Sequence, residues 1–274
     1  MSAVIQFGVP FAEYLKIDAV NWSSLKLMGE SARAYRWNLD HRQDDTDTPS
    51  RKLGRATHTL ALDPGQFAAQ YAVFDGDRRA GPAWTAFEKA NAGRDILKES
   101  EIETARRIAA SVQECRLLDA YRVGAQYEVT ITWTDPATGL RCKARPDWLP
   151  GDPEALIDLK TTRTINARRF TSQAEEYSYF AQLAHYRNGL RALGRSVSKV
   201  LIAAVESKPP FDVGVFALSD MAIDSAAGEV AELMGTLADC LKTNRWPGRY
   251  DSEQALCRPE WALGGDLSFT PDED

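Results

Sequence analysis

Residues Pro146 to Lys160 read PDWLPGDPEALIDLK and carry the strongest indication of the fold in this chain. The Pro-Gly-Asp-Pro centre of this stretch predicts a tight turn between two short extended segments, which is a β-hairpin. Asp147 and Asp158 then stand nearly opposite each other, and directly opposed residues have Cβ atoms about 4.5 to 5.5 Å apart. Lys160 follows Asp158 by two positions, so both side chains leave the same face of the strand. Two carboxylates and a lysine so placed predict a metal-dependent site for phosphodiester chemistry.

The segments around this hairpin predict an α/β fold. Strands are expected where apolar and polar residues alternate, and helices where apolar residues recur every three or four positions. The expected strands lie at residues 126–133, 140–149, 155–161, 199–206 and 212–218, and the expected helices at 99–119, 172–193 and 222–242. We expect the first three strands to form a meander within a mixed central sheet that is flanked by helices.

The chain is expected to fold as one integrated domain with three parts. Residues 1–98 predict a mainly helical N-terminal elaboration, with helices at 22–37 and 53–62. Residues 99–265 form the predicted α/β core. Residues 266–274 form an acidic tail that is expected to be disordered at its end.

Composition restricts the class of protein. The chain has 274 residues, of which 44% are hydrophobic and 26% charged, as is typical of an ordered globular protein. No apolar run approaches the roughly 20 residues of a membrane span, and the N-terminus lacks a basic segment followed by an apolar one. We therefore expect a cytoplasmic protein without membrane contact. Four cysteines without a Cys-x-x-Cys pair predict buried free thiols rather than zinc or iron–sulfur ligands.

The net charge of −6 is only a weak argument against a nucleic-acid partner. Acids that collect around a metal make a chain acidic overall even when a basic surface lies nearby. Arg163, Arg168 and Arg169 cluster just after the hairpin and are candidates for contact with DNA phosphates. A solvated charged face is the ordinary alternative for such a cluster.

Lys160 has a chemical role beside the two acids. Its ammonium group can orient or deprotonate a water and can offset the charge that develops on a phosphate in the transition state. The helix expected at 172–193 adds Gln182 and Tyr186, which lie one helical turn apart and face the same side.

Pro-Asp, a gap, Asp-x-Lys and a downstream Gln-x-x-x-Tyr together resemble the PD-(D/E)xK nuclease superfamily in its RecB-like branch. Other segments are similar to RecE-type exonucleases, the exodeoxyribonuclease VIII group carried by prophages, and the similarity extends over residues 21–261. These segments are GRATH at residues 54–58, CKARPD at 142–147, and Trp246-Pro247-Gly248.

The resemblance implies a PD-(D/E)xK nuclease core and a role for each site residue. It implies that Lys160 is the catalytic lysine and that Gln182 and Tyr186 contact the DNA end or brace the site. The implied ligands of Mg²⁺, which Mn²⁺ can replace, are His58, Asp147, Asp158, the carbonyl of Leu159 and, as an additional acid, Glu128. An iron–sulfur cluster is not expected.

The resemblance also implies an activity and partners. The implied enzyme degrades linear double-stranded DNA from its ends, in the 5′ to 3′ direction, and leaves 3′ single-stranded tails. A RecT-type annealing protein would use these tails in DNA recombination. The implied assembly is a homo-oligomeric ring around DNA.

Each interpretation has an alternative at the level of the residues. Asp147 and Asp158 can belong to a structural hairpin that pairs them with Arg145 and Lys143. His58 can be a satisfied core histidine, and Tyr186 can be a core residue. At the level of function, the alternatives are a non-catalytic DNA-end-binding protein and a restriction-like endonuclease with the same core.

Overall fold

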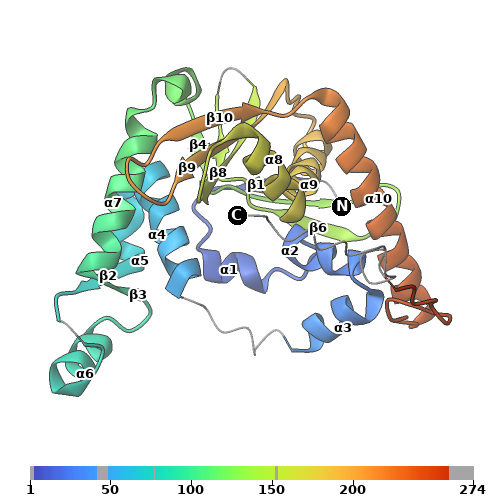
Figure 1. Cartoon of the computed structure of the whole chain (residues 1–274), viewed down its shortest axis with the longest axis horizontal. Helices are drawn as coiled ribbons and strands as arrows, with labels where there is room; N and C mark the ends of the chain where they lie inside the picture. Colours follow the sequence, from blue (N-terminus) through green and yellow to red (C-terminus); the bar gives the residue numbers. More distant parts are fainter. Residues whose placement is uncertain (1–2, 42–48, 77, 152–153, 259–274) are drawn as a thin grey trace, which may run out of the picture.

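The computed structural model describes residues 3–41, 49–76, 78–151 and 154–258. A five-stranded sheet in the order β10-β9-β8-β7-β4 forms its centre, and helices pack beside it (Figure 1). The strands of this central sheet are β4 (Gln126–Tyr127), β7 (Trp148–Leu149), β8 (Ala155–Thr162), β9 (Lys199–Glu206) and β10 (Val213–Ala217).

Strand β8 connects the two halves of the central sheet. It pairs in parallel with β9 and antiparallel with β7, so the sheet is mixed and the predicted α/β class is confirmed. Trp148 pairs with Ile157, which places Asp147 and Asp158 side by side one position further along. The predicted turn reaches residues 152–153, which lie outside the described residues, as does the acidic tail at 266–274.

A second, antiparallel sheet has the order β1-β5-β6. Its strands are β1 (Val4–Gln6), β5 (Thr130–Thr134) and β6 (Arg141–Ala144). The predicted single meander is wrong, because the chain leaves this sheet after Ala144 and joins the central sheet at Trp148. The crossing segment, residues 145–147, contains Pro146, which has no N–H group to donate to a strand ladder.

The strand predicted at 126–133 is divided between the two sheets at Glu128. This residue has a φ of 51°, in the left-handed region that a regular strand excludes. Its amide donates a hydrogen bond of 3.0 Å to the carbonyl of Asp147. The break therefore joins Glu128 to the crossing segment that carries Asp147.

The observed helices differ from the predicted ones mainly because several predicted helices are interrupted or end early. The predicted helix at 172–193 is interrupted at Ser178, whose φ of 57° is incompatible with a continuing right-handed helix. The helix predicted at 99–119 ends earlier, because Cys115 has extended backbone angles. The helix predicted at 22–37 is also divided. The helical elements are α1 (Phe11–Lys16), α2 (Trp22–Leu25), η1 (Lys26–Gly29), α3 (Ala32–Asp40), α4 (Pro49–Leu62), η3 (Pro64–Gln66), α5 (Phe67–Gln70), α6 (Gly81–Ala90), α7 (Glu99–Glu114), η4 (Arg116–Tyr121), α8 (Ala167–Glu176), α9 (Tyr179–Ala192) and α10 (Asp220–Thr243).

The alternation of side chains along β8 separates two cores. Ile157 and Leu159 pack with residues of α4 and α7 on one face. Leu156 packs with residues of α9, α10 and β5 on the other. Asp158 and Lys160 follow Leu156 at intervals of two, so their side chains leave the sheet on the same face as Leu156. The two polar side chains therefore lie within the layer between β8 and α9.

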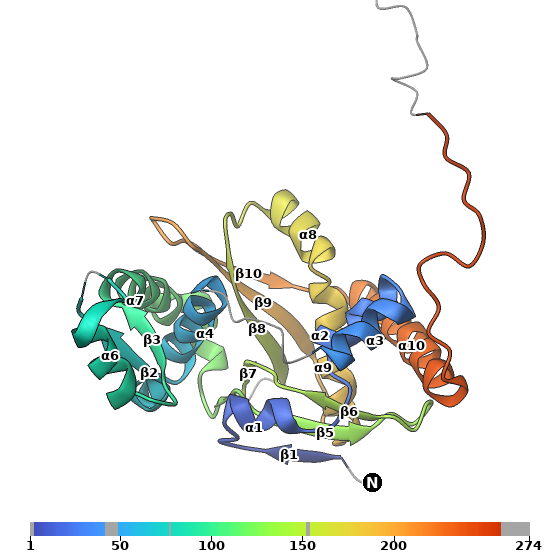
Figure 2. The same cartoon turned by 90° about the horizontal axis from the view of Figure 1, so that it is seen from below.

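The N-terminal part contains strands as well as helices. Strands β2 (Tyr71–Phe74) and β3 (Asp95–Lys98) pair in parallel and pack with α4 and α7. Strand β1 instead pairs with β5 of the core. Figure 2 shows α4, α6 and α7 grouped with β2 and β3, while α1 lies alongside β5.

Buried Lys143 on β6 fixes the position of α1. Its side chain is 2% exposed, and its Nζ donates to the carbonyls of Tyr14, Leu15 and Ile17 at 3.0, 3.2 and 2.8 Å. A charged donor therefore satisfies three carbonyls at the C-terminal end of a short helix.

Two predictions from composition can be compared with the structure. None of the described helices is both long and apolar enough to cross a membrane. The four cysteines are free, but only Cys142 and Cys240 are buried, whereas Cys115 is half-buried and Cys257 is exposed. The prediction that all four thiols are buried is therefore wrong for Cys115 and Cys257, and Cys257 lies after α10, outside the described helices and strands.

Candidate functional site

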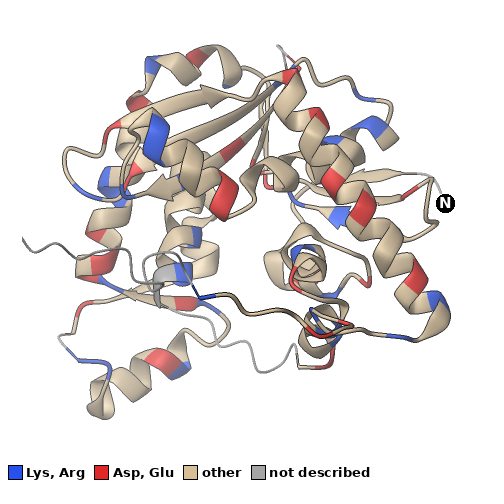
Figure 3. Cartoon of the chain, turned by 45° about the vertical axis from the view of Figure 1, so that its right-hand side comes forward, with Lys and Arg blue, Asp and Glu red and all other residues tan. Residues whose placement is uncertain are grey.

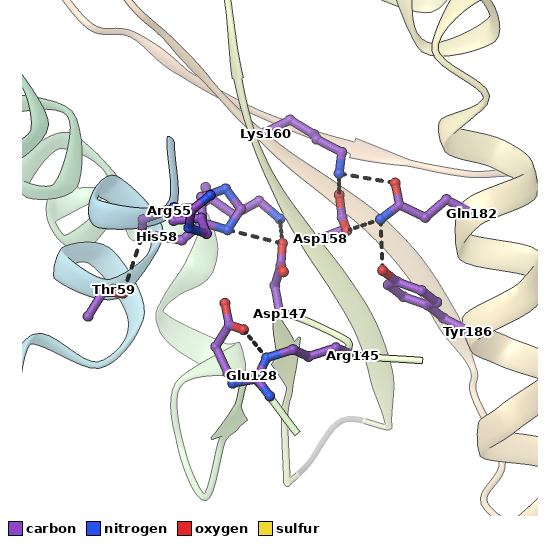
Figure 4. A network of polar contacts seen from close by, with 11 residues as sticks. Arg55, His58, Thr59, Glu128, Arg145, Asp147, Asp158, Lys160, Gln182 and Tyr186 are labelled. Carbon is purple, nitrogen blue, oxygen red and sulfur yellow. Dashed lines mark hydrogen bonds and ion pairs between the residues drawn. The ribbon is translucent and has the colours of Figure 1, made fainter. Parts of the chain in front are cut away.

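Polar side chains from several elements converge where β7 and β8 meet (Figure 4). The elements are far apart in the sequence, and the central sheet brings their side chains together. The converging residues are His58 on α4, Glu128 at the β4–β5 break, Asp147 on the crossing segment, Asp158 and Lys160 on β8, and Gln182 and Tyr186 on α9.

His58, Glu128 and Asp147 form a group that can hold a metal ion. One ligand atom of each lies within 4.8 Å of the others, and all three residues are half-buried. His58 Nδ1 is 3.5 Å from Asp147 Oδ2, and the same oxygen accepts a hydrogen bond of 2.9 Å from the amide of Leu159. Carboxylate oxygens suit Mg²⁺ and Mn²⁺, and an imidazole nitrogen is a ligand for transition metals.

Arg145 fixes the orientation of Glu128. Arg145 Nε donates to Glu128 Oε2 at 2.7 Å, and Arg145 Nη1 donates to the carbonyl of Val9 at 2.8 Å. The guanidinium group thus links the metal-binding group to the N-terminal segment that precedes α1. Because Glu128 also has a left-handed backbone, both its main chain and its side chain are set by contacts outside a regular strand.

Asp158 and Lys160 form the second half of the site. Lys160 Nζ lies 2.6 Å from Asp158 Oδ2 and donates to Gln182 Oε1 at 3.1 Å. Gln182 Nε2 donates to Asp158 Oδ1 at 3.4 Å and to the hydroxyl of Tyr186 at 2.9 Å. The Lys160 ammonium also lies 4.7 Å from the ring centroid of Tyr179. Helix α9 therefore holds the acid and the lysine in fixed positions.

The two aspartates have opposite electrostatic environments. Burial acts to raise the pKa of Asp147, but His58, Lys160 and the amide of Leu159 outweigh it and hold that pKa below its usual value. Burial raises the pKa of Asp158 to about 6, because the attraction of Lys160 offsets only part of this effect and Asp147 adds repulsion. Asp147 is thus the more strongly ionised of the two acids.

The other titratable groups respond to the same acids. Burial acts to lower the pKa of His58, but the charge and hydrogen bond of Asp147 and the charge of Glu128 together outweigh it and raise that pKa. Burial and then the charge of Asp147 raise the pKa of Glu128. Burial acts to lower the pKa of Lys160, while Asp158 and Asp147 raise it by more.

These environments fit a divalent cation. Two half-buried carboxylates and an imidazole stand together, and burial first and then repulsion by Asp147 raise the pKa values of Glu128 and Asp158. A cation held by His58, Glu128 and Asp147 would remove that repulsion. Asp158 lies outside this group and contacts Lys160 and Gln182.

The structure places the remaining predicted residues as follows. Leu159 reaches the site through its amide, which donates to Asp147. Arg163, Arg168 and Arg169 line a groove that begins at Thr161, next to Lys160 in the sequence. Glu128, predicted within a strand that neighbours Asp147, lies instead at the break between β4 and β5.

The alternative in which Asp147 and Asp158 pair with Arg145 and Lys143 is not observed. Arg145 pairs with Glu128, and Lys143 donates to carbonyls of α1, so these two cations have partners other than Asp147 and Asp158. Tyr186 is half-buried but contributes its hydroxyl to Gln182. His185 is a core residue, since it is 1% exposed and its Nε2 is 3.1 Å from the carbonyl of Lys143.

Sequence patterns do not identify two residues of the network. The sequence suggests Arg145 only as a partner for the aspartates, and its pairing with Glu128 depends on the left-handed turn at Glu128. Helical spacing places Tyr179 on the packing face of a helix, whereas its ring lies against Lys160. The sequence does contain an indication that Tyr179 belongs to the site. Tyr179 precedes Gln182 by three positions, which places both side chains on one side of α9.

Charge is distributed unevenly over the surface. Acidic residues recur along α10, as Figure 3 shows. Asp220, Asp224, Glu229, Glu232 and Asp239 all lie on this helix. DNA phosphates are repelled by such a surface. The arginines that follow β8 are on a different element, next to the site.

The sequence matches the family described as a PDDEXK-like domain of unknown function (DUF3799) over residues 21–259. No curated protein matches it significantly. Among solved structures, a protein of Eubacterium rectale described as a candidate exonuclease is similar in fold, with a TM-score of 0.62 and 16% identity over 93% of this chain and 96% of that chain. A second structure, of the protein SSO0001, gives a TM-score of only 0.38 at 14% identity over 83% of this chain and 88% of that chain, and it adds no argument.

The family match includes each of the three residues that can hold a metal ion, and it confirms the predicted PD-(D/E)xK superfamily. The similarity to the Eubacterium rectale protein shows that the fold extends over nearly the whole chain. The chain therefore belongs to the family of PDDEXK-like domains of unknown function (DUF3799).

Proposed function

We propose that this protein is a metal-dependent exonuclease that degrades linear double-stranded DNA from its ends. The observation that carries the proposal is the convergence of a metal-binding group and an acid–lysine pair where β7 and β8 meet. His58, Glu128 and Asp147 form the group, and Asp158 and Lys160 form the pair. Phosphodiester hydrolysis needs both a means to activate water and a cation to offset the charge on the phosphate.

Each side chain has a role that its contacts support. A bound Mg²⁺ or Mn²⁺ would lower the pKa of a water and polarise a phosphoryl oxygen. Asp158 keeps Lys160 protonated, because its charge raises the pKa of that lysine. The Lys160 ammonium can then offset negative charge on the phosphate. The Gln182 side chain hydrogen-bonds both the Lys160 ammonium and the Asp158 carboxylate, and it donates a further hydrogen bond to the Tyr186 hydroxyl.

Further parts of the proposal rest on similarity and on the sequence motifs. The similar protein from Eubacterium rectale is a candidate exonuclease, and the RecE-type motifs favour attack at DNA ends with 5′ to 3′ polarity. In this proposal, 3′ tails pass to a RecT-type annealing protein for recombination, and the subunits form a ring. The carbonyl of Leu159 and the carboxylate of Asp158 complete the metal ligands in the RecE-type arrangement.

A comparison of circular and linear DNA tests the proposal. Purified protein is incubated with covalently closed circles and with linear duplexes of the same sequence, in Mg²⁺, in Mn²⁺ and in EDTA. Linear DNA should be degraded only with metal, and circles should persist. Duplexes labelled at the 5′ or the 3′ end then give the polarity.

The variant Asp158→Asn tests whether the site is required for activity. Its matched control is Asp239→Asn, which neutralises an acid on α10, far along the chain from the site. Loss of activity in the first and retention in the second support the proposal. Cleavage of the circles would instead indicate a restriction-like endonuclease. A wild-type protein that binds DNA ends but cleaves neither substrate would indicate a non-catalytic accessory protein.

A further inference from the structure

We propose that a groove between the end of β8 and helix α8 binds single-stranded DNA beside the metal centre. This inference rests on the proposed function, which supplies DNA as the ligand. The β8–α8 groove has a volume of about 1050 Å³. Its lining includes Arg163, Asn166, Arg168, Arg169, Glu176 and Tyr177.

The break between α8 and α9 gives the groove its aromatic side chain. Left-handed Ser178 separates the two helices, and Tyr177 and Tyr179 stand on either side of it. Tyr177 is 50% exposed and lines the groove, whereas Tyr179 lies against Lys160. The two rings are 5.8 Å apart between centroids, at an angle of 58°. The two tyrosine rings therefore connect Lys160 to the groove by direct neighbours.

Three arginines supply positive charge along this path. Arg163, Arg168 and Arg169 are all exposed, and within the described ranges none of their guanidinium groups lies within ion-pair distance of a carboxylate. Glu176 is the acid among the lining residues, so the lining carries an excess of positive charge. Guanidinium groups without a carboxylate partner, in a concave surface, are suited to phosphates.

The walls of the groove are fixed before any ligand binds. Thr162 Oγ1 donates to Gln173 Oε1 at 3.0 Å, which connects the end of β8 to α8. On its buried side, α8 packs Phe170 against Phe216 with ring centroids 4.8 Å apart. Asn166 caps the start of α8 by accepting from the amide of Arg169. A preformed groove costs less ordering free energy on binding than a flexible segment would.

The combination of groups favours a single strand over a duplex. An exposed tyrosine ring can stack on an unpaired base, whereas the bases of a duplex are already stacked on each other. Arginines beside such a ring can follow the phosphates of one strand. An exonuclease that removes nucleotides from one strand of a duplex leaves the other strand unpaired at this location. The β8–α8 groove is therefore suited to the strand separated at the DNA end.

Fluorescence anisotropy with a labelled oligothymidylate about 20 nucleotides long tests the inference, in EDTA and over a range of salt concentrations. Tyr177→Ala should weaken binding by about tenfold, while Tyr177→Phe should keep the wild-type affinity because it keeps the ring. The double variant Arg168→Ala/Arg169→Ala should reduce the slope of log affinity against log salt by about 1.4, because each phosphate that an arginine neutralises contributes about 0.7.

The matched control is Arg106→Ala/Arg107→Ala, which removes two consecutive exposed arginines from α7 that pair with Glu99 and Glu103. It should leave the affinity and the salt slope unchanged. Wild-type affinity and slope in both the Tyr177→Ala and the Arg168→Ala/Arg169→Ala proteins would overturn the inference, as would an equal loss of binding to a blunt duplex.

The two proposals fail separately. Metal-dependent degradation of linear DNA by a protein whose single-strand binding is independent of Tyr177 would overturn the groove alone. Binding of the oligothymidylate that depends on Tyr177, in a protein without any nuclease activity, would support the groove and overturn the proposed function.

Discussion

Lys160 Nζ lies 2.6 Å from Asp158 Oδ2, and the two side chains leave β8 on the same face, toward α9. Asp158 is 1% exposed, so solvent contributes little to its environment, and its carboxylate contacts this lysine and the side-chain amide of Gln182. The pair has a geometry that a surface ion pair seldom keeps, because α9 restricts both groups.

Replacement of either member should therefore remove activity. Lys160→Met and Asp158→Asn should each lower the rate of DNA degradation by at least about 100-fold, since each removes charge at the reacting phosphate. Degradation of an end-labelled duplex measures the rate, and circular dichroism monitors the fold. Lys199→Met, which changes an exposed lysine at the start of β9, is the control. A Lys160→Met protein with a rate within about threefold of wild type would contradict the assignment.

Metal binding should depend on His58 and Glu128. Titration with Mn²⁺ in a calorimeter should give binding to the wild-type protein, with affinity at least about tenfold lower for His58→Ala and for Glu128→Gln. His41→Ala provides the comparison, because His41 is exposed and stacks on Trp37. Equal affinities for all four proteins would place the metal elsewhere.

The stability of the fold should fall in mild acid because of His185. Burial lowers the pKa of His185 to about 4, whereas an unfolded histidine has a pKa of about 6.5. The folded state thus favours the neutral ring. Its contribution to stability is complete above about pH 6.5 and is lost as the pH falls from there toward 4.

For His185 alone, the loss in the free energy of unfolding between about pH 7.5 and about pH 5 should be about 2 kcal/mol. Urea denaturation of wild type and of His185→Gln at both pH values isolates this contribution, since other groups titrate alike in the two proteins. An identical pH dependence in the two proteins would exclude a buried neutral imidazole at this position.

Lys143→Met should lower the free energy of unfolding by about 2 to 3 kcal/mol. The substitution leaves the carbonyls of Tyr14, Leu15 and Ile17 without their charged donor. Lys16→Met is the control, since Lys16 lies on the same helix but is exposed and forms an ion pair with the neighbouring Glu13. Urea denaturation measures the difference, and a decrease below about 0.5 kcal/mol would show that the three carbonyls are satisfied in another way.

The hairpin and its acids could be predicted from sequence because their determinants are local. The Pro-Gly-Asp-Pro sequence at residues 150–153 predicts a turn, and a register that pairs Trp148 with Ile157 places Asp147 beside Asp158. The alternation in residues 155–161 likewise determines that Lys160 shares a face with Asp158.

The breaks could not be predicted, because contacts between distant segments cause them. Left-handed backbone at Glu128 and Ser178 is unfavourable for both residue types and is retained only where surrounding contacts hold it. The short strands β2 and β3 are four residues long each and, among the described residues, pair only with each other, so neither has a clear periodicity. Consequently, the sequence predicts the acids and the lysine, but not the pairing of Arg145 or the groove beside Tyr177.

His58 reaches the acids from α4, a helix whose own core contains buried Ala56 and residues of α7, whereas Asp147 belongs to the segment between the two sheets. A metal ion shared by His58 and Asp147 would couple two equilibria, its own binding and the docking of α4 on the core. Thermodynamic reciprocity then requires that each equilibrium favour the other by the same free energy. Enlargement of Ala56, which is 0% exposed, should weaken the metal affinity from a distance although every ligand is still present.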